Sequence, residues 1–158
     1  MNICIINEGF HLGGVERVVI EMANSFKKNG EDVTLIDFSG KNIFYYNVEK
    51  DIKTPNVIKS RNFNRKVKKG IQYIKYEINK KPFNIINLYK EQLKELINYL
   101  KNSNHEVVIL CQGILTALLP ILKSELPNIK MVAWQHNEFD VYIKNYYKRF
   151  VNDYLLGV

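Results

Sequence analysis

The chain has 158 residues, enough for one domain with a buried core, and its 46% hydrophobic and 25% charged residues are typical of a globular protein. It contains no apolar run of about eighteen residues, which excludes a membrane-spanning helix, and it lacks the charged segment and cleavage site of a signal peptide. We therefore expect a cytoplasmic protein. Cys4 and Cys111 lie inside apolar runs, which favours buried thiols over a disulfide.

The first forty residues have the pattern of a strand, a glycine loop, a helix and a second strand. An apolar run over 3–6 ends in a loop that contains Gly13 and Gly14. Apolar residues then recur at helical spacing over 15–26, and a second apolar run covers 33–38. Such a βαβ unit predicts a parallel sheet with a right-handed crossover.

The glycine loop has two interpretations. A helix N-terminus presents unpaired N–H groups and a positive dipole end, and glycines let a ligand approach the backbone closely. The loop reads Gly-Phe-His-Leu-Gly-Gly, which is not the dinucleotide fingerprint Gly-x-Gly-x-x-Gly. Gly13 and Gly14 therefore form either an anion site or a tight turn. Glu16, in the first turn of the helix, suits either a ligand contact or capping of the helix.

The rest of the chain alternates between helical and strand-like patterns. Pro120 lies either in the first turn of a helix that starts near Thr116 or at a kink. This alternation predicts an α/β fold: a Rossmann-like, doubly wound, mostly parallel sheet with helices on both faces. The elements that we expect are helices over 61–79, 86–101, 114–126 and 142–155, strands over 107–111 and 130–134, and two short strands over 43–46 and 57–58.

Polar clusters follow three of the predicted strands. In doubly wound sheets, ligands bind outside the carboxyl ends of the strands. We therefore expect the segments 7–14, 112–113 and 135–138 to meet at one edge of the sheet. The candidates that they supply are Gln112, Gly113, His136 and Asn137, with a structural histidine as the alternative for His136 and either cleft lining or plain solvation for His11. Asp140 suits the N-cap of the last helix, and His105 suits the surface.

The positive charge is concentrated in one segment. Of the net charge of +7, residues 59–81 carry +8, from nine basic residues and one acidic residue. Three interpretations are open: a solvated face of a helix whose apolar stripe packs on the sheet, an anionic membrane surface, or nucleic acid. No nucleic-acid motif is present, so we expect no nucleic-acid partner. The candidates for membrane contact are Arg61, Arg65, Lys66, Lys68 and Lys69.

Two segments resemble a known family. These are Gly13-Gly-Val-Glu-Arg-Val-Val19, directly after the first strand, and Val132-Ala-Trp-Gln-His-Asn-Glu-Phe139. They are similar to the N-terminal part of GT-B glycosyltransferases of the large retaining family 4, in particular enzymes that build bacterial surface polysaccharides. The resemblance covers most of the chain, although residues 41–105 match only in general layout.

The resemblance implies a role for the chain and its residues. In such enzymes an N-terminal domain binds the acceptor and a C-terminal domain binds the nucleotide sugar. Gly13 and Gly14 would lie against a diphosphate or an acceptor phosphate, and His136 would contact the transferred sugar. No metal or other cofactor is expected. The acceptor would be a glycan or a lipid-linked molecule, with peripheral contact to the inner face of the membrane.

The length of the chain departs from the family. Residues 1–158 would form only the N-terminal domain, without the domain that mainly holds the nucleotide-sugar donor, and we expect the chain alone to be inactive. The alternative is a Rossmann-like module without catalysis, which docks on an anionic membrane or on a partner protein.

Overall fold

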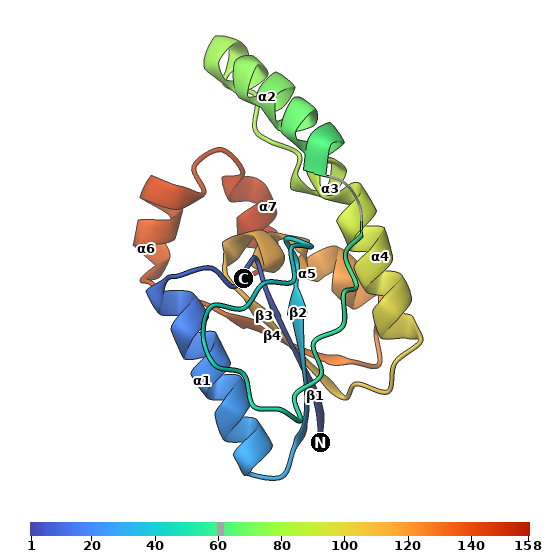
Figure 1. The fold of residues 1–158 in the computed structure, drawn as a ribbon. Helices are drawn as coiled ribbons and strands as arrows, with labels where there is room; N and C mark the ends of the chain where they lie inside the picture. Colours follow the sequence, from blue (N-terminus) through green and yellow to red (C-terminus); the bar gives the residue numbers. More distant parts are fainter. Residues whose placement is uncertain (60–61) are drawn as a thin grey trace.

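The computed structural model describes residues 1–59 and 62–158. Within these residues, parallel strands form a single sheet in the order β2-β1-β3-β4 (Figure 1). The strand order reverses between β1 and β3, so the predicted doubly wound α/β fold is confirmed. The strands are β1 (Asn2–Asn7), β2 (Asp32–Asp37), β3 (Val107–Cys111) and β4 (Lys130–Trp134).

Helices cover both faces of the sheet. On one face, α1 (Gly14–Lys28) packs through apolar residues such as Val19 and Ile20. On the other face lie α4 (Lys90–Lys101) and α5 (Gly113–Glu125). Successive residues of β1 enter opposite layers, Cys4 with α4 and α5 and Ile5 with α1. Because both faces are buried, the central strands read as continuous apolar runs. The remaining elements are α2 (Asn62–Asn79), α3 (Ile85–Leu88), α6 (Phe139–Val141), the π-helix η1 (Tyr142–Tyr146) and α7 (Val151–Leu156).

Several predicted elements have different bounds. The helix predicted over 86–101 is divided at Tyr89 into α3 and α4. Because α5 begins at Gly113, a start near Thr116 is wrong, and Pro120 lies inside the helix. Proline has no N–H, so the Thr116 carbonyl lacks its usual helical donor. Gly157 fits against this carbonyl, where a Cβ atom would overlap the Thr116 oxygen.

The predictions for the last segment and for the region between β2 and α2 also need correction. The single helix expected over 142–155 is replaced by α6, η1 and α7, with a break over 147–150. Asp140 is not an N-cap, since α6 begins one residue earlier and Asp140 pairs with Lys144 at 2.8 Å. The short strands expected over 43–46 and 57–58 are not strands. Phe44, Tyr46, Val57 and Ile58 pack against the core without a ladder, whereas Ile43 and Tyr45 are exposed.

Helix α2 stands away from the sheet, beyond the carboxyl ends of the strands (Figure 1). Its apolar stripe does not pack on the sheet, so that expectation is wrong. The described members of the stripe are exposed: Val67, Ile71, Ile74 and Ile78. Arg61 lies outside the described residues. In the part of the chain that is described, no helix combines the length and the apolar character needed to cross a bilayer.

Candidate functional site

The loops that follow β1, β3 and β4 lie at the carboxyl edge of the sheet, and we call this edge the rim: residues 8–14, 112–113 and 135–138. The parallel order of the strands brings these three segments together although up to about 130 residues separate them in the chain. Because β3 lies between β1 and β4, the first and last of these loops start about 10 Å apart. The rim can therefore flank a ligand from two sides.

Gly13 is the N-cap of α1, and both of its backbone polar groups contact the side chain of Tyr46. Its backbone is extended, with φ −170° and ψ 159°. The Tyr46 hydroxyl accepts a hydrogen bond from the Gly13 N–H at 3.2 Å and donates to the Gly13 carbonyl at 3.1 Å. A Cβ atom at Gly13 would overlap the Glu16 carboxylate. The Gly13 amide is thus occupied by the chain itself.

Gly14, the first residue of α1, is exposed and differs from Gly13. A Cβ atom placed there would meet nothing within 4 Å, so packing does not require glycine. The space beside Gly14 leads directly to the N-terminal end of α1, where the partial positive charge of the helix dipole is largest. A phosphate can approach the helix here. An anion contact at Gly14 stays a prediction, and the room for it is present.

Glu16 is buried and lies between the loop after β1 and the end of β3. Its Oε1 lies 3.6 Å from Nε2 of His11 and 3.5 Å from Nε2 of Gln112. The Gly13 N–H donates to Tyr46, so Glu16 forms no capping box with it. The acidic side chain of Glu16 does lie in the first turn of α1, where the helix dipole favours it. Glu16 therefore links the loop after β1 to the end of β3.

Glu8 is a rim residue that the sequence did not single out. Its Oε1 accepts a hydrogen bond from the Ile114 N–H at 3.0 Å, at the N-terminal end of α5. The pKa of Glu8 is raised to about 7. Burial is the main cause and the negative charge of Glu16 adds to it, while the hydrogen bond from Ile114 and the charges of Lys69 and Arg65 lower the pKa. A carboxyl that titrates near neutral pH can exchange protons with a ligand. Its position directly after the first strand was the available signal.

The N-terminal end of α5 is also occupied by the chain. The Gly113 N–H donates to the Tyr147 hydroxyl at 2.9 Å, and a Cβ atom at Gly113 would overlap the Tyr147 ring. A ligand can reach the Gly113 amide only if Tyr147 moves. Gln112, which precedes it, has φ 79°, a left-handed conformation that costs on the order of 1–3 kcal/mol outside glycine and is found most often at functional sites.

His136 and Asn137 are exposed at the end of β4. Their backbone N–H groups both donate to the hydroxyl of the buried Tyr142, at 3.0 and 3.1 Å. This tyrosine therefore holds the turn in place. The His136 ring lies 5.6 Å from the ring of Trp134. Within residues 1–59 and 62–158, no contact joins His136 to the glycine loop. His136 is thus presented to solvent across the rim from α1.

The expectation that His105 lies at the surface is wrong. His105, predicted at the surface, is half-buried before β3, at the opposite end of the sheet. Its two ring nitrogens are buried without hydrogen-bond partners, and burial lowers the pKa of His105. Its ring lies 6.0 Å from the ring of Tyr99. His105 is therefore remote from the rim.

The basic side chains of α2 divide into two groups. The Arg65 guanidinium lies 5.1 Å from the centre of the Tyr89 ring, so Arg65 faces the body of the protein. The charge of Lys69 also acts on Glu8, although Lys69 is exposed. Lys66 is exposed, and Lys68 is half-buried beside a pocket described below. In residues 1–59 and 62–158, no group of three His, Cys, Asp or Glu side chains has an arrangement that could hold a metal ion.

Comparison with known proteins gives one informative similarity. No protein-family model matches the chain. The chain is similar to a protein of Haemophilus influenzae that is named an uncharacterized glycosyltransferase. The two sequences are 27% identical over 128 residues, which is 81% of this chain and 30% of the relative. The chain thus spans less than one third of the relative's length.

Proposed function

We propose that this chain is the acceptor-side domain of a retaining GT-B glycosyltransferase, which transfers a sugar from a nucleotide-sugar donor to a glycan or lipid-linked acceptor. The similarity to the Haemophilus influenzae glycosyltransferase supports sugar transfer, and the doubly wound sheet is compatible with one half of a GT-B fold. In this proposal a second domain, outside these 158 residues, holds most of the donor.

The observation that carries the proposal is the open N-terminal end of α1 at Gly14, on the same rim as the exposed His136. When the bond between a sugar and a nucleoside diphosphate breaks, negative charge grows on the leaving phosphate. A fixed positive dipole end stabilises that charge without reorganisation. The charges of Arg65 and Lys69, which act on the neighbouring Glu8, add to the positive potential there. This chemistry needs no metal ion.

In this proposal the other rim residues have the following roles. His136 contacts the transferred sugar near the reacting carbon, and Asn137 and Gln112 supply amide groups for sugar hydroxyls. Glu16 holds the glycine loop in place through its contact with Gln112. Gly113 contributes an N–H only in a state in which Tyr147 has moved.

The phosphate contact at Gly14 can be tested by removing a single N–H. Proline is tolerated at the first position of a helix, and the extended backbone of Gly13 is the conformation that a following proline requires. Gly14→Pro should therefore fold normally and weaken the binding of pyrophosphate, measured by NMR titration, about tenfold. Gly70→Ala, in α2, is the control with unchanged affinity. Absence of pyrophosphate binding to the unaltered chain would overturn the phosphate role.

Sugar transfer is tested with paired histidine variants of the intact gene product. His136→Ala should lower the transfer of labelled sugar from a nucleotide-sugar donor about 100-fold, because a group at the reacting centre is lost. His105→Ala, at the other end of the sheet, should keep the transfer rate. The anomeric configuration of the product, read by NMR, tests retention. Equal turnover by both variants would remove His136 from the mechanism.

A further inference from the structure

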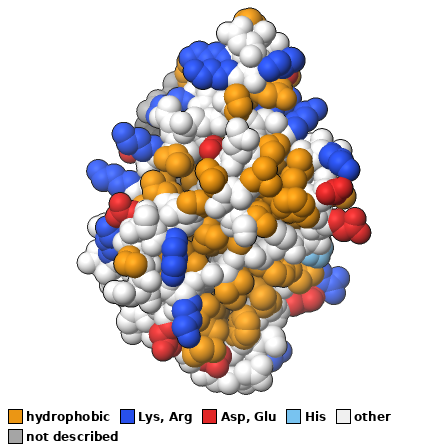
Figure 2. All heavy atoms as spheres, turned by 180° about the vertical axis from the view of Figure 1, so that it is seen from behind, with side chains coloured by type: hydrophobic (Ala, Val, Ile, Leu, Met, Phe, Trp, Pro, Cys, Tyr) orange, Lys and Arg blue, Asp and Glu red, His pale blue; other side chains and the backbone are white. Residues whose placement is uncertain are grey.

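The exposed apolar stripe of α2 runs along most of the helix. Val67, Ile71, Ile74 and Ile78 are spaced by four, three and four residues, so they lie on one side of the helix. Their exposed fractions are 49%, 49%, 59% and 73%. From behind, Lys and Arg side chains surround the upper end of the molecule, where α2 lies (Figure 2). An apolar surface of this kind usually marks an interaction site.

The opposite side of α2 holds the helix in this orientation. The ring of Tyr76 packs edge-on against Phe83, with 6.2 Å between ring centres. The Arg149 guanidinium lies 4.8 Å from the Tyr73 ring and 5.6 Å from the Tyr76 ring, and it pairs with Glu77 at 3.8 Å. These contacts fix which face of α2 points outward. These contacts on the opposite side of α2 therefore keep the apolar stripe facing solvent.

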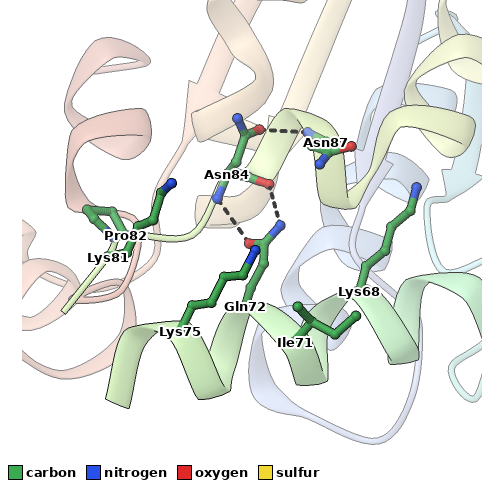
Figure 3. A pocket seen from close by; sticks show the side chains of 8 residues that line it. All are labelled: Lys68, Ile71, Gln72, Lys75, Lys81, Pro82, Asn84 and Asn87. Carbon is green, nitrogen blue, oxygen red and sulfur yellow. Dashed lines mark hydrogen bonds between the residues drawn. The ribbon is translucent and has the colours of Figure 1, made fainter. Parts of the chain in front are cut away.

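A basic pocket lies along one edge of the stripe (Figure 3). Lys68, Lys75 and Lys81 line it, and its volume is about 300 Å³. The Asn84 N–H donates to the Gln72 side chain at 3.0 Å, which joins the two walls of the pocket. No carboxylate lines the pocket, and none of the three lysines forms an ion pair within the described residues. Unpaired ammonium groups of this kind attract anions.

An anionic lipid surface is the partner that matches both features. Helices that lie in a membrane interface combine an aliphatic face with lysines at its edges. The aliphatic face enters the boundary of the acyl chains, while the lysines bind headgroup phosphates. Nucleic acid would use the lysines but leave the aliphatic stripe in water. A purely apolar protein partner would leave the pocket unused.

We propose that α2 docks this protein on an anionic bilayer, with Val67, Ile71, Ile74 and Ile78 in the interface and a headgroup phosphate in the pocket of Lys68, Lys75 and Lys81. Arg65 and Lys69 lie on the side of α2 away from the stripe by their helical spacing and are not part of this surface. The proposal is independent of sugar transfer. It places the rim beside the membrane, because α2 extends beyond the carboxyl ends of the strands (Figure 1).

Co-sedimentation with vesicles tests the proposal. The unaltered chain should bind vesicles of phosphatidylcholine with added phosphatidylglycerol at about 0.1 M salt, and at least tenfold more weakly when phosphatidylglycerol is omitted. Lys68→Gln with Lys75→Gln should weaken binding about 30-fold, since each lysine near an anionic surface contributes about fivefold. The charge-matched control is Lys41→Gln with Lys130→Gln, on exposed lysines elsewhere, which should change binding less than threefold.

The stripe is tested separately from the charge. Ile74→Ser with Ile78→Ser should weaken vesicle binding at least tenfold at every salt concentration, because apolar burial is lost. Ile43→Ser with Leu156→Ser removes equally exposed apolar side chains elsewhere and should have no such effect. Thermal unfolding of each variant verifies folding; the altered apolar side chains are exposed and Lys68 is half-buried.

Four results would overturn the proposal. The first is wild-type vesicle binding by the stripe variant, and the second is equal weakening by the lysine pair and its control. The third is a site for free phosphate rather than for a headgroup: saturable binding of glycerol 3-phosphate through Lys68 and Lys75, without binding to vesicles. Tighter binding to single-stranded RNA than to anionic vesicles would assign the surface to nucleic acid instead.

Discussion

The Glu8 carboxylate connects the end of β1 with the start of α5 through its hydrogen bond to the Ile114 N–H. Burial holds the pKa of Glu8 at about 7, well above the value of about 4.3 for an unperturbed glutamate. Between these two values the folded chain binds more protons than the unfolded chain. The contribution of Glu8 to the free energy of unfolding therefore decreases as the pH rises through this window and is constant above it.

The variant Glu8→Gln should remove this pH dependence, because glutamine keeps the hydrogen-bond acceptor but cannot ionise. Urea unfolding from pH 4 to pH 8 should show equal stabilities at the acid end. The variant should gain a growing advantage that reaches the order of 3 kcal/mol above pH 7, since one pKa unit corresponds to about 1.4 kcal/mol. Glu138→Gln, on the exposed part of the rim, is the control. A difference that is constant with pH would contradict the argument.

Individual site residues were predictable where they directly follow the end of a predicted strand. Gln112 and His136 follow apolar runs, and the parallel sheet puts both on the rim. The hydroxyl groups that occupy rim amides were not predictable. Tyr46 bonds Gly13 from 33 residues away and Tyr147 bonds Gly113 from 34 residues away, and no local pattern marks such partners.

Tyrosines hold the segment from α6 to α7 against the body of the domain. The rings of Tyr142, Tyr147 and Tyr154 pack on one another with centres 5.0 to 6.0 Å apart. Their hydroxyl groups have different surroundings. That of Tyr142 accepts two backbone N–H groups, whereas that of Tyr154 is buried without a partner. In this ring cluster the hydroxyl of Tyr142 therefore stabilises the fold, whereas that of Tyr154 destabilises it.

Removing each hydroxyl should have opposite effects. Tyr154→Phe should raise the free energy of unfolding by about 1 kcal/mol, because a buried hydroxyl without a partner is no longer desolvated. Tyr142→Phe should lower it by about 1 kcal/mol and speed the hydrogen exchange of the His136 and Asn137 amides. Chemical denaturation and NMR exchange measure the two effects. Destabilisation by both variants would show that the hydroxyl of Tyr154 has a partner after all.

At the scale of elements, apolar runs and helical spacing predicted the strands and the longer helices. The errors lie where apolar residues are buried without regular backbone pairing. Phe44 and Tyr46 pack beside α1 from a loop, and alternating burial alone cannot distinguish that from a strand. In the last segment, the helical spacing of aromatic residues hid the break between η1 and α7.

At the scale of the whole molecule, the sequence predicted the layers but not the position of α2. A stripe of apolar residues shows that one face of a helix differs from the other, and it does not say what that face contacts. The contacts that orient α2 come from Phe83, shortly after the helix, and from Arg149, far along the chain. Such long-range contacts leave no periodic signal.

The two free cysteines lie in different layers of the molecule, Cys4 with α4 and α5 and Cys111 with α1. The sheet separates their side chains, so the folded chain cannot oxidise them to an internal disulfide. Burial raises the pKa of both thiols, that of Cys111 to about 12, which keeps the reactive thiolate scarce until a layer opens. Each layer therefore has its own chemical reporter, and the order in which a thiol reagent labels the two is the order in which the layers come apart.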